Sequence, residues 1–237
     1  MDGSVAPRRL TVAARTLWHH RGMADNDSRA GLRYSTPAIL DWVAQVHTPQ
    51  DQALTRAFAT PDHVPAIMVG PAEGKLIALL CRLGNVARAV EVGTLVGYSA
   101  IHIARALPAG GHLWTIEYEA EHAALAEGNL AAAGVADRVT VLRGAGVDVL
   151  PTLVEHGPFD AVFLDADKVS YGHYARWALA NLRPGGLILG DNAYLFGELM
   201  DDSPRGRGMR EFHELVAAAC DSVCIPTPDG LVLAIKR

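Results

Sequence analysis

From residue 84 onwards, short apolar runs alternate with longer segments in which apolar residues recur every three or four positions. The short runs predict buried strands, and the longer periodic segments predict amphipathic helices. Strands are expected at about 88–92, 112–117, 138–143, 159–165 and 187–191, and helices near 98–107, 119–133, 147–155, 171–182 and 207–219. This alternation predicts an α/β fold with a mostly parallel sheet and right-handed crossovers.

The carboxyl terminus follows a different pattern. Residues 223–226 and 231–236 are apolar segments on either side of a Pro-Asp-Gly turn, which predicts an antiparallel β-hairpin. The hairpin and the alternating elements together indicate a three-layer sandwich whose sheet ends in antiparallel strands.

Three further helices are predicted before the sheet begins. The first opens at Pro37 and carries its apolar residues on one face, at Ile39, Leu40, Val43 and Val46. The second ends near Phe58. The third opens at Pro71, and we expect its apolar residues to point inward: Leu76, Ile77, Leu79, Leu80 and Leu83. We therefore predict a single domain over 34–237, with a helical cap at 34–83 and a ligand-binding core at 84–237.

Residues 1–33 have another composition, rich in arginine and poor in apolar periodicity. A basic, acid-poor segment of this kind is also typical of a transit peptide. We interpret it as a disordered arm, or as an extension that precedes a natural start at Met23.

Composition narrows the classes of function. The net charge of −5 and the pI of about 6.0 give no general attraction for polyanions. The three cysteines, Cys81, Cys220 and Cys224, lack CxxC spacing, which favours free thiols in a reducing compartment such as the cytoplasm. No apolar run approaches the length of a membrane span.

Polar residues end two of the predicted strands where turn residues would be usual. Asp165 ends the strand at 159–165, and Asp191 and Asn192 lie at the end of the strand at 187–191. Because ligands of open α/β sheets bind at the carboxyl ends of strands, these three oxygen donors are expected to meet there. A hard divalent cation such as Mg²⁺, or else Mn²⁺ or Ca²⁺, prefers this donor set. Lys168 is near enough to act as a base beside the metal, although a purely structural ion pair with Asp165 is the alternative.

The first strand leads into a glycine loop and then a helix. Gly93 and Gly97 are spaced as GxxxG, which differs from the dinucleotide pattern GxGxxG, and the acid Glu91 lies at the strand end. A carboxylate there would repel a pyrophosphate and attract an ammonium or sulfonium group, as in S-adenosylmethionine. Glu117 closes the second strand, where an acid accepts ribose hydroxyls in related folds. A tight turn required only for packing is the alternative for the glycine pair.

The segments VEVGTLVGYS, IEYE, FDAVFLDADKxxYxxY and GDN, with the final PxxDGLxLAxK, resemble the cation-dependent class I S-adenosylmethionine O-methyltransferases of the catechol and caffeoyl-CoA type. The resemblance runs from about residue 60 to the carboxyl terminus, and DADK and DN are its most specific parts. It implies a Rossmann-like, seven-stranded sheet with one antiparallel strand, usually in a dimer, that uses S-adenosylmethionine and Mg²⁺.

The resemblance also implies roles for individual residues. Asp165, Asp191 and Asn192 would hold the metal, and Lys168 would take the phenolic proton. The methyl donor would contact Glu91, Gly93, Thr94, Ser99 and Glu117, with further contacts at Val69, Ala145, Asp165 and Asp167. After DN, the run Ala193-Tyr194-Leu195-Phe196 departs from many relatives, and Phe196 replaces a polar contact of the caffeoyl-CoA branch. A CoA thioester acceptor is therefore not expected, and Tyr194 and Phe196 are predicted to wall the acceptor site.

These observations predict a cytoplasmic, homodimeric O-methyltransferase that acts on a small catechol-like or vicinal-diol acceptor, away from membranes and nucleic acid. One alternative within the fold is a methyltransferase of hydroxylated uridines in tRNA, for which Arg205, Arg207 and Arg210 could form a local basic patch. The segment 201–210, which contains them, mixes charge with Gly and Pro as mobile lids do. A nicotinamide-dependent oxidoreductase is disfavoured by the missing GxGxxG and by Glu91.

Overall fold

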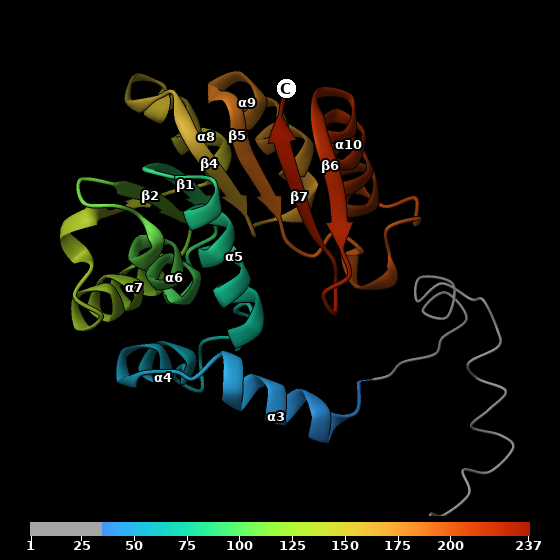
Figure 1. The fold of residues 1–237 in the computed structure, drawn as a ribbon. Helices are drawn as coiled ribbons and strands as arrows, with labels where there is room; N and C mark the ends of the chain where they lie inside the picture. The colour runs from blue at the N-terminus through green and yellow to red at the C-terminus, as the bar shows by residue number, and fades with distance from the viewer. Residues whose placement is uncertain (1–34) are drawn as a thin grey trace, which may run out of the picture. The chain divides into compact units, whose positions relative to one another are not determined.

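The computed structural model describes residues 35–237, so the interpretations of residues 1–33 lie outside the described residues. Seven strands form one sheet in the order β3-β2-β1-β4-β5-β7-β6 (Figure 1). The strands are β1 (Arg88–Val92), β2 (His112–Glu117), β3 (Val139–Arg143), β4 (Phe159–Leu164), β5 (Leu182–Gly190), β6 (Cys220–Ile225) and β7 (Leu231–Lys236). All neighbours pair in parallel except β7, which is antiparallel to β5 and β6. The predicted fold class and the terminal hairpin are confirmed.

The helices also follow the predicted order. They are α3 (Pro37–His47), α4 (Gln52–Phe58), α5 (Pro71–Leu83), α6 (Tyr98–Ala106), α7 (Ala120–Ala132), α8 (Gly146–Val149), α9 (Tyr171–Asn181) and α10 (Pro204–Ala219). Short 3-10 turns lie at η1 (Ala136–Arg138), η2 (Leu150–His156), η3 (Lys168–Ser170) and η4 (Leu195–Gly197). The helix predicted at 147–155 is split into α8 and η2, because Pro151 cannot donate the backbone hydrogen bond that would continue α8.

Contacts between residues divide the chain after Val46, and the sheet with its flanking helices lies in the unit 47–237. Helix α3 forms where it was predicted, but none of its residues is buried, so its apolar face is exposed. The proposed domain boundary at residue 34 stays a prediction.

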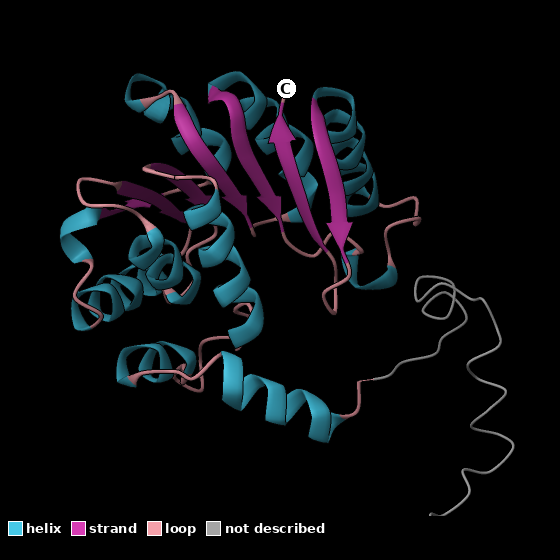
Figure 2. Ribbon diagram, in the orientation of Figure 1, coloured by secondary structure: helices cyan, strands magenta, loops and turns pink. Residues whose placement is uncertain are grey.

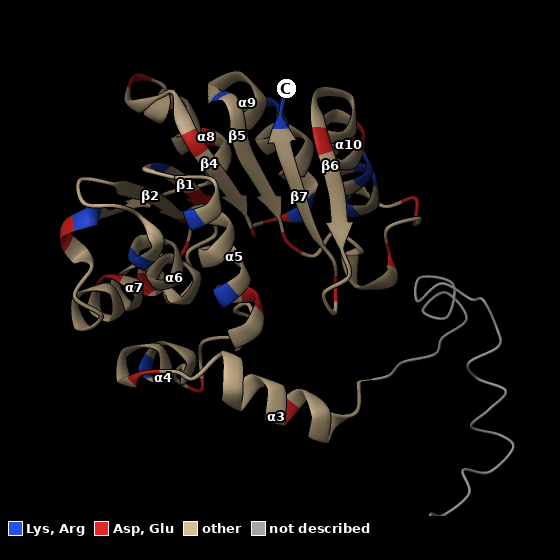
Figure 3. Ribbon diagram, in the orientation of Figure 1, with Lys and Arg blue, Asp and Glu red and all other residues tan. Residues whose placement is uncertain are grey.

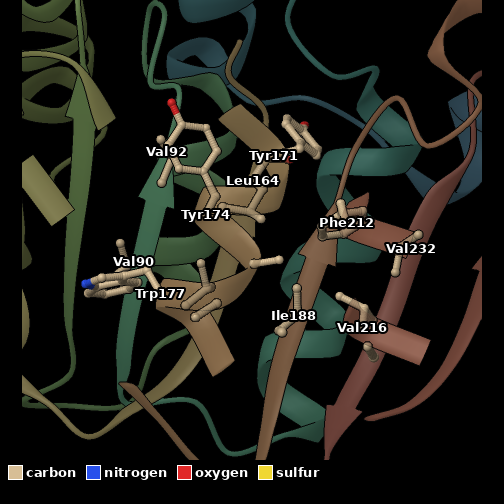
Figure 4. Close-up of a cluster of buried hydrophobic side chains, with 14 of the residues drawn as sticks. Val90, Val92, Leu164, Tyr171, Tyr174, Trp177, Ile188, Phe212, Val216 and Val232 are labelled. Carbon is tan, nitrogen blue, oxygen red and sulfur yellow. The ribbon is translucent and has the colours of Figure 1, made fainter. Parts of the chain in front are cut away.

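Each face of the sheet is covered by helices, as Figure 2 shows. Because side chains of a strand alternate between faces, Val90 and Val92 of β1 join one buried cluster while Ala89 joins the other. The first cluster packs under α9 and α10, where it contains Trp177 and Phe212 (Figure 4). The second packs under α5, α6 and α7.

The inward orientation predicted for Leu79 and Leu83 in α5 is wrong. Ile77 and Cys81 face the sheet, and a residue two positions further along a helix points about 200° away from its predecessor. Leu83 is accordingly 81% exposed. Within residues 35–237, no helix combines the length and hydrophobicity needed to cross a membrane.

Candidate active site

A cavity of about 780 Å³ opens at the carboxyl ends of β1, β2 and β4. The topology brings most of the predicted site residues to its wall. Those that line it are Val69, Gly93, Thr94, Ser99, Glu117, Ala145, Asp165, Asp167, Lys168, Asn192 and Phe196. Glu91, Asp191 and Tyr194 do not line this cavity, and direct ligand contacts by these three residues stay predictions.

The loop between β1 and α6 is a tight turn fixed from several sides. Gly93 and Gly97 have φ of +99° and +84°, in the left-handed region that favours glycine. Gly97 is the residue before α6, and its backbone N–H donates to the carbonyl of Thr94 at 2.8 Å. The side chain of Asn129 donates to the carbonyl of Val96 at 2.9 Å and ties the loop to α7. The loop therefore presents backbone to the cavity in one defined conformation.

Glu117 is held by the same loop. One of its carboxylate oxygens accepts the backbone N–H groups of Thr94 and Leu95 at 3.2 and 2.7 Å, and the other accepts the N–H of Glu119 at 2.9 Å. His122 lies 3.7 Å from this second oxygen. Glu117 thus enters the cavity as an oriented acceptor at the tip of β2, where an acid can receive hydroxyl groups of a ligand.

Glu91 has a different environment from the one predicted. Its side chain is fully buried, and its two oxygens accept the hydroxyls of Ser99 and Thr115, each at 2.5 Å. Burial raises the pKa of Glu91 to about 7, and the charges of Asp165 and Glu117 act in the same direction. Glu91 lies behind the cavity wall formed by Ser99, so it can act on a bound cation through the field of its charge.

Lys168 opens the turn η3, which follows the end of β4. Its Nζ donates to Asp165 Oδ1 at 3.0 Å and to the hydroxyl of Tyr171 at 2.9 Å, and its side chain is only 9% exposed. The hydroxyl of Tyr171 in turn contacts the carbonyl oxygens of Leu164 and Asp191 at 2.9 and 3.0 Å. Tyr171, which Figure 4 shows beside Leu164, thus links the ends of β4 and β5 through its hydroxyl. Its role was missed in the sequence, although it is the first tyrosine of the YxxY segment.

Asp191 and Asn192 follow β5 directly. The N–H of Asp191 donates to the carbonyl of Leu164 at 2.9 Å, which sets the two strand ends side by side. Burial, together with the negative charges of Asp165 and Glu73, raises the pKa of Asp191 to about 8. Asn192 has φ of +56°, in the left-handed region that asparagine tolerates.

These residues fit a divalent cation by their chemistry. Among residues 35–237, no three His, Cys, Asp or Glu side chains form a metal-binding group by themselves. The amide oxygen of Asn192 would add a third oxygen donor to those of Asp165 and Asp191. The negative charge of Asp165 raises the pKa of both Glu73 and Asp191. The positive charge of Lys168 acts in the opposite direction on the pKa of Asp191. An excess of buried negative charge with oxygen donors suits a hard dication. Glu73, from α5, was missed because its position in the sequence is far from both strand ends.

In the segment after Asn192, Phe196 lines the cavity and Tyr194 does not, and contact of either with an acceptor stays a prediction. Leu195 is fully buried in the core, and Tyr194 packs against the position of Gly230. Phe196 lines the cavity and is 63% exposed, and its N–H donates to Asp229 Oδ1 at 2.8 Å. Its φ of +54° is rare for a bulky residue, which indicates a conformation maintained by its surroundings. Ile67, Met68 and Tyr118 add apolar wall that the sequence did not indicate.

The segment 201–210 is not a free loop, which corrects its interpretation as a lid. Its residues from Pro204 onwards form the first turns of α10, and Ser203 caps that helix by accepting the N–H of Gly206 at 3.0 Å. The arginines in it have local partners: Arg205 pairs with Glu198, Arg207 with Asp202, and Arg210 donates to the carbonyls of Leu199 and Asp201.

Comparison with known proteins identifies similar chains. The family described as O-methyltransferase matches residues 47–237. A catechol O-methyltransferase of Niastella koreensis is 43% identical over 186 residues, which cover 73% of this chain and 84% of that protein. A catechol O-methyltransferase of Mycobacterium tuberculosis is 39% identical over 198 residues, which cover 79% and 90% of the two chains.

Solved structures that resemble this chain are also O-methyltransferases. An O-methyltransferase of Streptomyces achromogenes involved in tomaymycin synthesis, in complex with S-adenosylmethionine, superposes with a TM-score of 0.79 at 37% identity and covers 84% of this chain and 96% of its own. An O-methyltransferase of Bacillus cereus in complex with S-adenosylhomocysteine has the same TM-score at 35% identity, with coverage of 84% and 97%.

Proposed function

The chain belongs to the O-methyltransferase family, and we propose that it moves a methyl group from S-adenosylmethionine to one hydroxyl of a small catechol-like or vicinal-diol acceptor, in a reaction that depends on a divalent metal ion. One observation carries this proposal. A single cavity is lined at one side by the glycine loop and Glu117 and at the other by Asp165, Lys168 and Asn192. The donor and the reacting hydroxyl can therefore be held in the same space, as an in-line transfer requires.

The donor is assigned to the side of the cavity formed by β1 and β2. Gly93 and Thr94 bring backbone close to it, and the carboxylate of Glu117 accepts its ribose hydroxyls. Ser99 lies at the amino end of α6, and Glu91 behind it, in its ionised form, favours the positively charged donor over the neutral product. Val69, Ala145 and Asp167 complete the proposed contacts.

The metal is assigned to Asp165, Asp191 and Asn192. A bound Mg²⁺, or else Mn²⁺ or Ca²⁺, supplies Lewis acidity that lowers the pKa of the acceptor hydroxyl. The two aspartates balance the charge of a dication, and the amide of Asn192 adds an oxygen ligand without further negative charge. Glu73, which raises the pKa of Asp191, places one more carboxylate near this set.

Lys168 is assigned as the general base. Its hydrogen bonds to Asp165 and Tyr171 fix the position of Nζ beside the proposed metal ligands. In the reaction, Nζ takes the proton of the acceptor hydroxyl while the oxygen forms a bond to the methyl carbon and the bond from that carbon to sulfur breaks. The proposed role requires that Lys168 is neutral before the transfer.

The acceptor is assigned to the apolar side of the cavity. Ile67, Met68 and Phe196 offer apolar surface in the cavity that Lys168 also lines, which suits a planar ring with adjacent hydroxyls. The arginines at 205–210 have local acidic or carbonyl partners, and Figure 3 shows Lys and Arg interspersed with Asp and Glu over the helices. This charge distribution supports a small molecule over tRNA as the acceptor. A steep fall of tRNA affinity with salt would favour the RNA alternative.

The central test is methyl transfer to a panel of catechols with a labelled donor, with and without EDTA. We expect turnover that is lost in EDTA and restored by Mg²⁺, and we expect Asn192→Ala to weaken Mn²⁺ binding, measured by calorimetry, while S-adenosylhomocysteine still binds. Full turnover after thorough chelation would overturn the metal dependence. Binding of NAD in place of S-adenosylmethionine, measured by thermal shift, would overturn the choice of cofactor.

We also propose that the enzyme is a cytoplasmic homodimer. Its three cysteines are free, as expected in a reducing compartment. Leu83 of α5 and Ile235 of β7 are exposed apolar residues. Both lie near Leu187 of β5: Ile235 is its partner in the sheet, and Gly84, the residue after Leu83, packs against its side chain. A second copy of the chain is assigned to this face. Leu83→Glu should convert the dimer to a monomer in light scattering, whereas Val154→Glu, on an exposed residue elsewhere, should not.

A further inference from the structure

Three polar groups surround the hydroxyl of Tyr171. Nζ of Lys168 lies 2.9 Å from it, and the carbonyl oxygens of Leu164 and Asp191 lie 2.9 and 3.0 Å from it. A carbonyl oxygen has no proton to give, so the hydroxyl must direct its single proton toward these two carbonyls. Its oxygen is then left to accept, and Lys168 is the donor. The two carbonyls thus fix the direction of the hydrogen bond between Lys168 and Tyr171.

The ring that carries this hydroxyl is held in place by the core. Tyr171 is the first residue of α9 and has no exposed surface. Its ring packs edge-on against Phe212 with 5.3 Å between the ring centroids, and it lies 6.2 Å from the ring of Tyr174 (Figure 4). Side chains in a close-packed interior occupy one rotamer, because a second one needs space that is already filled. The hydroxyl is therefore a fixed acceptor for Lys168.

The main chain of Lys168 is fixed as well. The side chain of Asp167 caps the turn η3 by accepting the N–H of Ser170 at 2.9 Å. Gly208 of α10 lies directly against the same turn, where a Cβ would be 2.6 Å from the carbonyl oxygens of both Lys168 and Val169. What remains free in Lys168 is its four-carbon stem, which has many rotamers unless its end is bound.

The two hydrogen bonds of Nζ determine where its lone pair points. In the neutral form that a base requires, the amine has two N–H groups and one lone pair. The hydroxyl of Tyr171 accepts one N–H, and Asp165, ionised as a metal ligand must be, accepts the other at 3.0 Å. The lone pair then takes the one tetrahedral direction that is left. Without the hydroxyl of Tyr171, one N–H would be free and the amino group could rotate about the bond from Cε to Nζ.

We propose that Tyr171 is a positioning residue for methyl transfer: its hydroxyl, together with Asp165, orients the amine of Lys168 so that the lone pair faces the acceptor hydroxyl in the cavity that Lys168 lines. The inference rests on the proposed function, because it requires Lys168 as the base. In the reaction the O–H bond of the acceptor breaks and its proton forms a new N–H bond on Nζ, while Tyr171 keeps its own proton. This alignment affects the proton transfer and not the binding of donor or acceptor.

The test is Tyr171→Phe, which keeps the buried ring and removes only the hydroxyl. With Mg²⁺ and the catechol that the wild type methylates fastest, kcat should fall roughly tenfold or more, because the base is no longer aligned. The KM values of the catechol and of the donor should stay within about twofold. Calorimetry should show wild-type affinity of the variant for Mn²⁺ and for S-adenosylhomocysteine. Tyr98→Phe is the matched control: it removes a buried hydroxyl that has no hydrogen-bond partner among residues 35–237, so kcat should not change.

A double variant shows whether Tyr171 acts through the base. In Lys168→Met the amine is gone, so adding Tyr171→Phe should slow single turnover no further, and the two losses should not add. An unchanged kcat in Tyr171→Phe, or additive losses in the double variant, would overturn the inference and leave the proposed methyl transfer intact. Mn²⁺ affinity that falls as much as kcat would also overturn it, since Tyr171 would then act by joining the strand ends. Normal turnover of Lys168→Met would overturn the base assignment and this inference together.

Discussion

Gly93 lies against the main chain of Asp165, so closely that a Cβ on Gly93 would be 2.0 Å from the carbonyl oxygen of Asp165. This contact joins the end of β1 to the end of β4, and it is possible only without a side chain. The N–H of Asp165 also donates to the carbonyl of Val92 at 2.9 Å, immediately before the glycine. The loop proposed to hold the donor and the strand end proposed to hold the metal are therefore fixed to each other by main-chain atoms.

Replacement of Gly93 by alanine should disturb both sites together. The new methyl group collides with backbone, and φ of +99° is unfavourable for alanine, so the loop or the strand end must move. We expect a loss of roughly tenfold or more in affinity for S-adenosylhomocysteine, about 1.4 kcal/mol, measured by calorimetry. Gly128→Ala is the matched control, because Gly128 lies in α7 with open space around it. A Gly93→Ala protein that binds the product normally would contradict the contact.

Replacement of Lys168 separates base catalysis from electrostatics. Lys168→Met removes the proposed proton acceptor and should lower kcat by roughly 10²- to 10⁴-fold. Lys168→Arg keeps the positive charge beside Asp165 but cannot accept a proton at neutral pH, so its kcat should be equally low. Single-turnover rates with saturating donor measure this. A Lys168→Arg variant with near wild-type turnover would show that charge alone is required.

The sequence predicted the sheet well because its elements obey local rules. The buried strands around Val90 and Val162 are short apolar runs, and the hairpin before Leu231 has the Pro-Asp-Gly turn that its geometry requires. Leu79 and Leu83 were assigned to the wrong side of α5, because the helix carries apolar residues on two faces and periodicity alone does not identify the buried one. The break of the predicted helix at Pro151 was a local signal that could have been used.

The sequence predicted the location of those candidate site residues that lie at or just after the end of a strand. Asp165 and Asn192 line the cavity, since a residue directly after a strand has a predictable location, and Lys168 lines it from the turn that follows Asp165. Glu73 and Tyr171 were missed, because their contacts depend on how α5 and α9 pack against the sheet. The burial of Glu91 was also not predictable: Ser99 and Thr115 use its oxygens, and Thr115 lies on a neighbouring strand.

Glu91 should make the stability of the protein depend on pH. Burial raises its pKa from the ordinary 4.5 to about 7, so the folded protein keeps a proton that the unfolded chain releases. The free energy of unfolding should therefore fall as pH rises from 4.5 to 7, by up to about 3 kcal/mol, and this contribution should be constant above 7. Urea unfolding of wild type and Glu91→Gln at pH 5, 6, 7 and 8 measures it. The difference between the two proteins should shrink or change sign with rising pH, and parallel curves would contradict the raised pKa.

Phe196 should contribute to acceptor binding and little to donor binding. It lines the apolar side of the cavity, so Phe196→Ala removes ring surface from the acceptor and should raise the KM of a catechol roughly tenfold, about 1.4 kcal/mol. The KM of the donor should stay within a factor of about two, the resolution of such a comparison. Met200→Ala serves as the control, because Met200 is exposed and does not line the cavity.

The variant Phe196→Gly then separates the contribution of the aromatic ring to acceptor binding from the effect of the backbone conformation at this position. Glycine accepts φ of +54° without strain, so this variant should lose acceptor affinity as Phe196→Ala does but unfold at a higher temperature than the alanine variant. If both variants bound the catechol as tightly as the wild type, the ring would have no part in the acceptor wall. If only the alanine variant lost affinity, the conformation of the segment after Asn192, and not the aromatic ring, would determine how the acceptor is held.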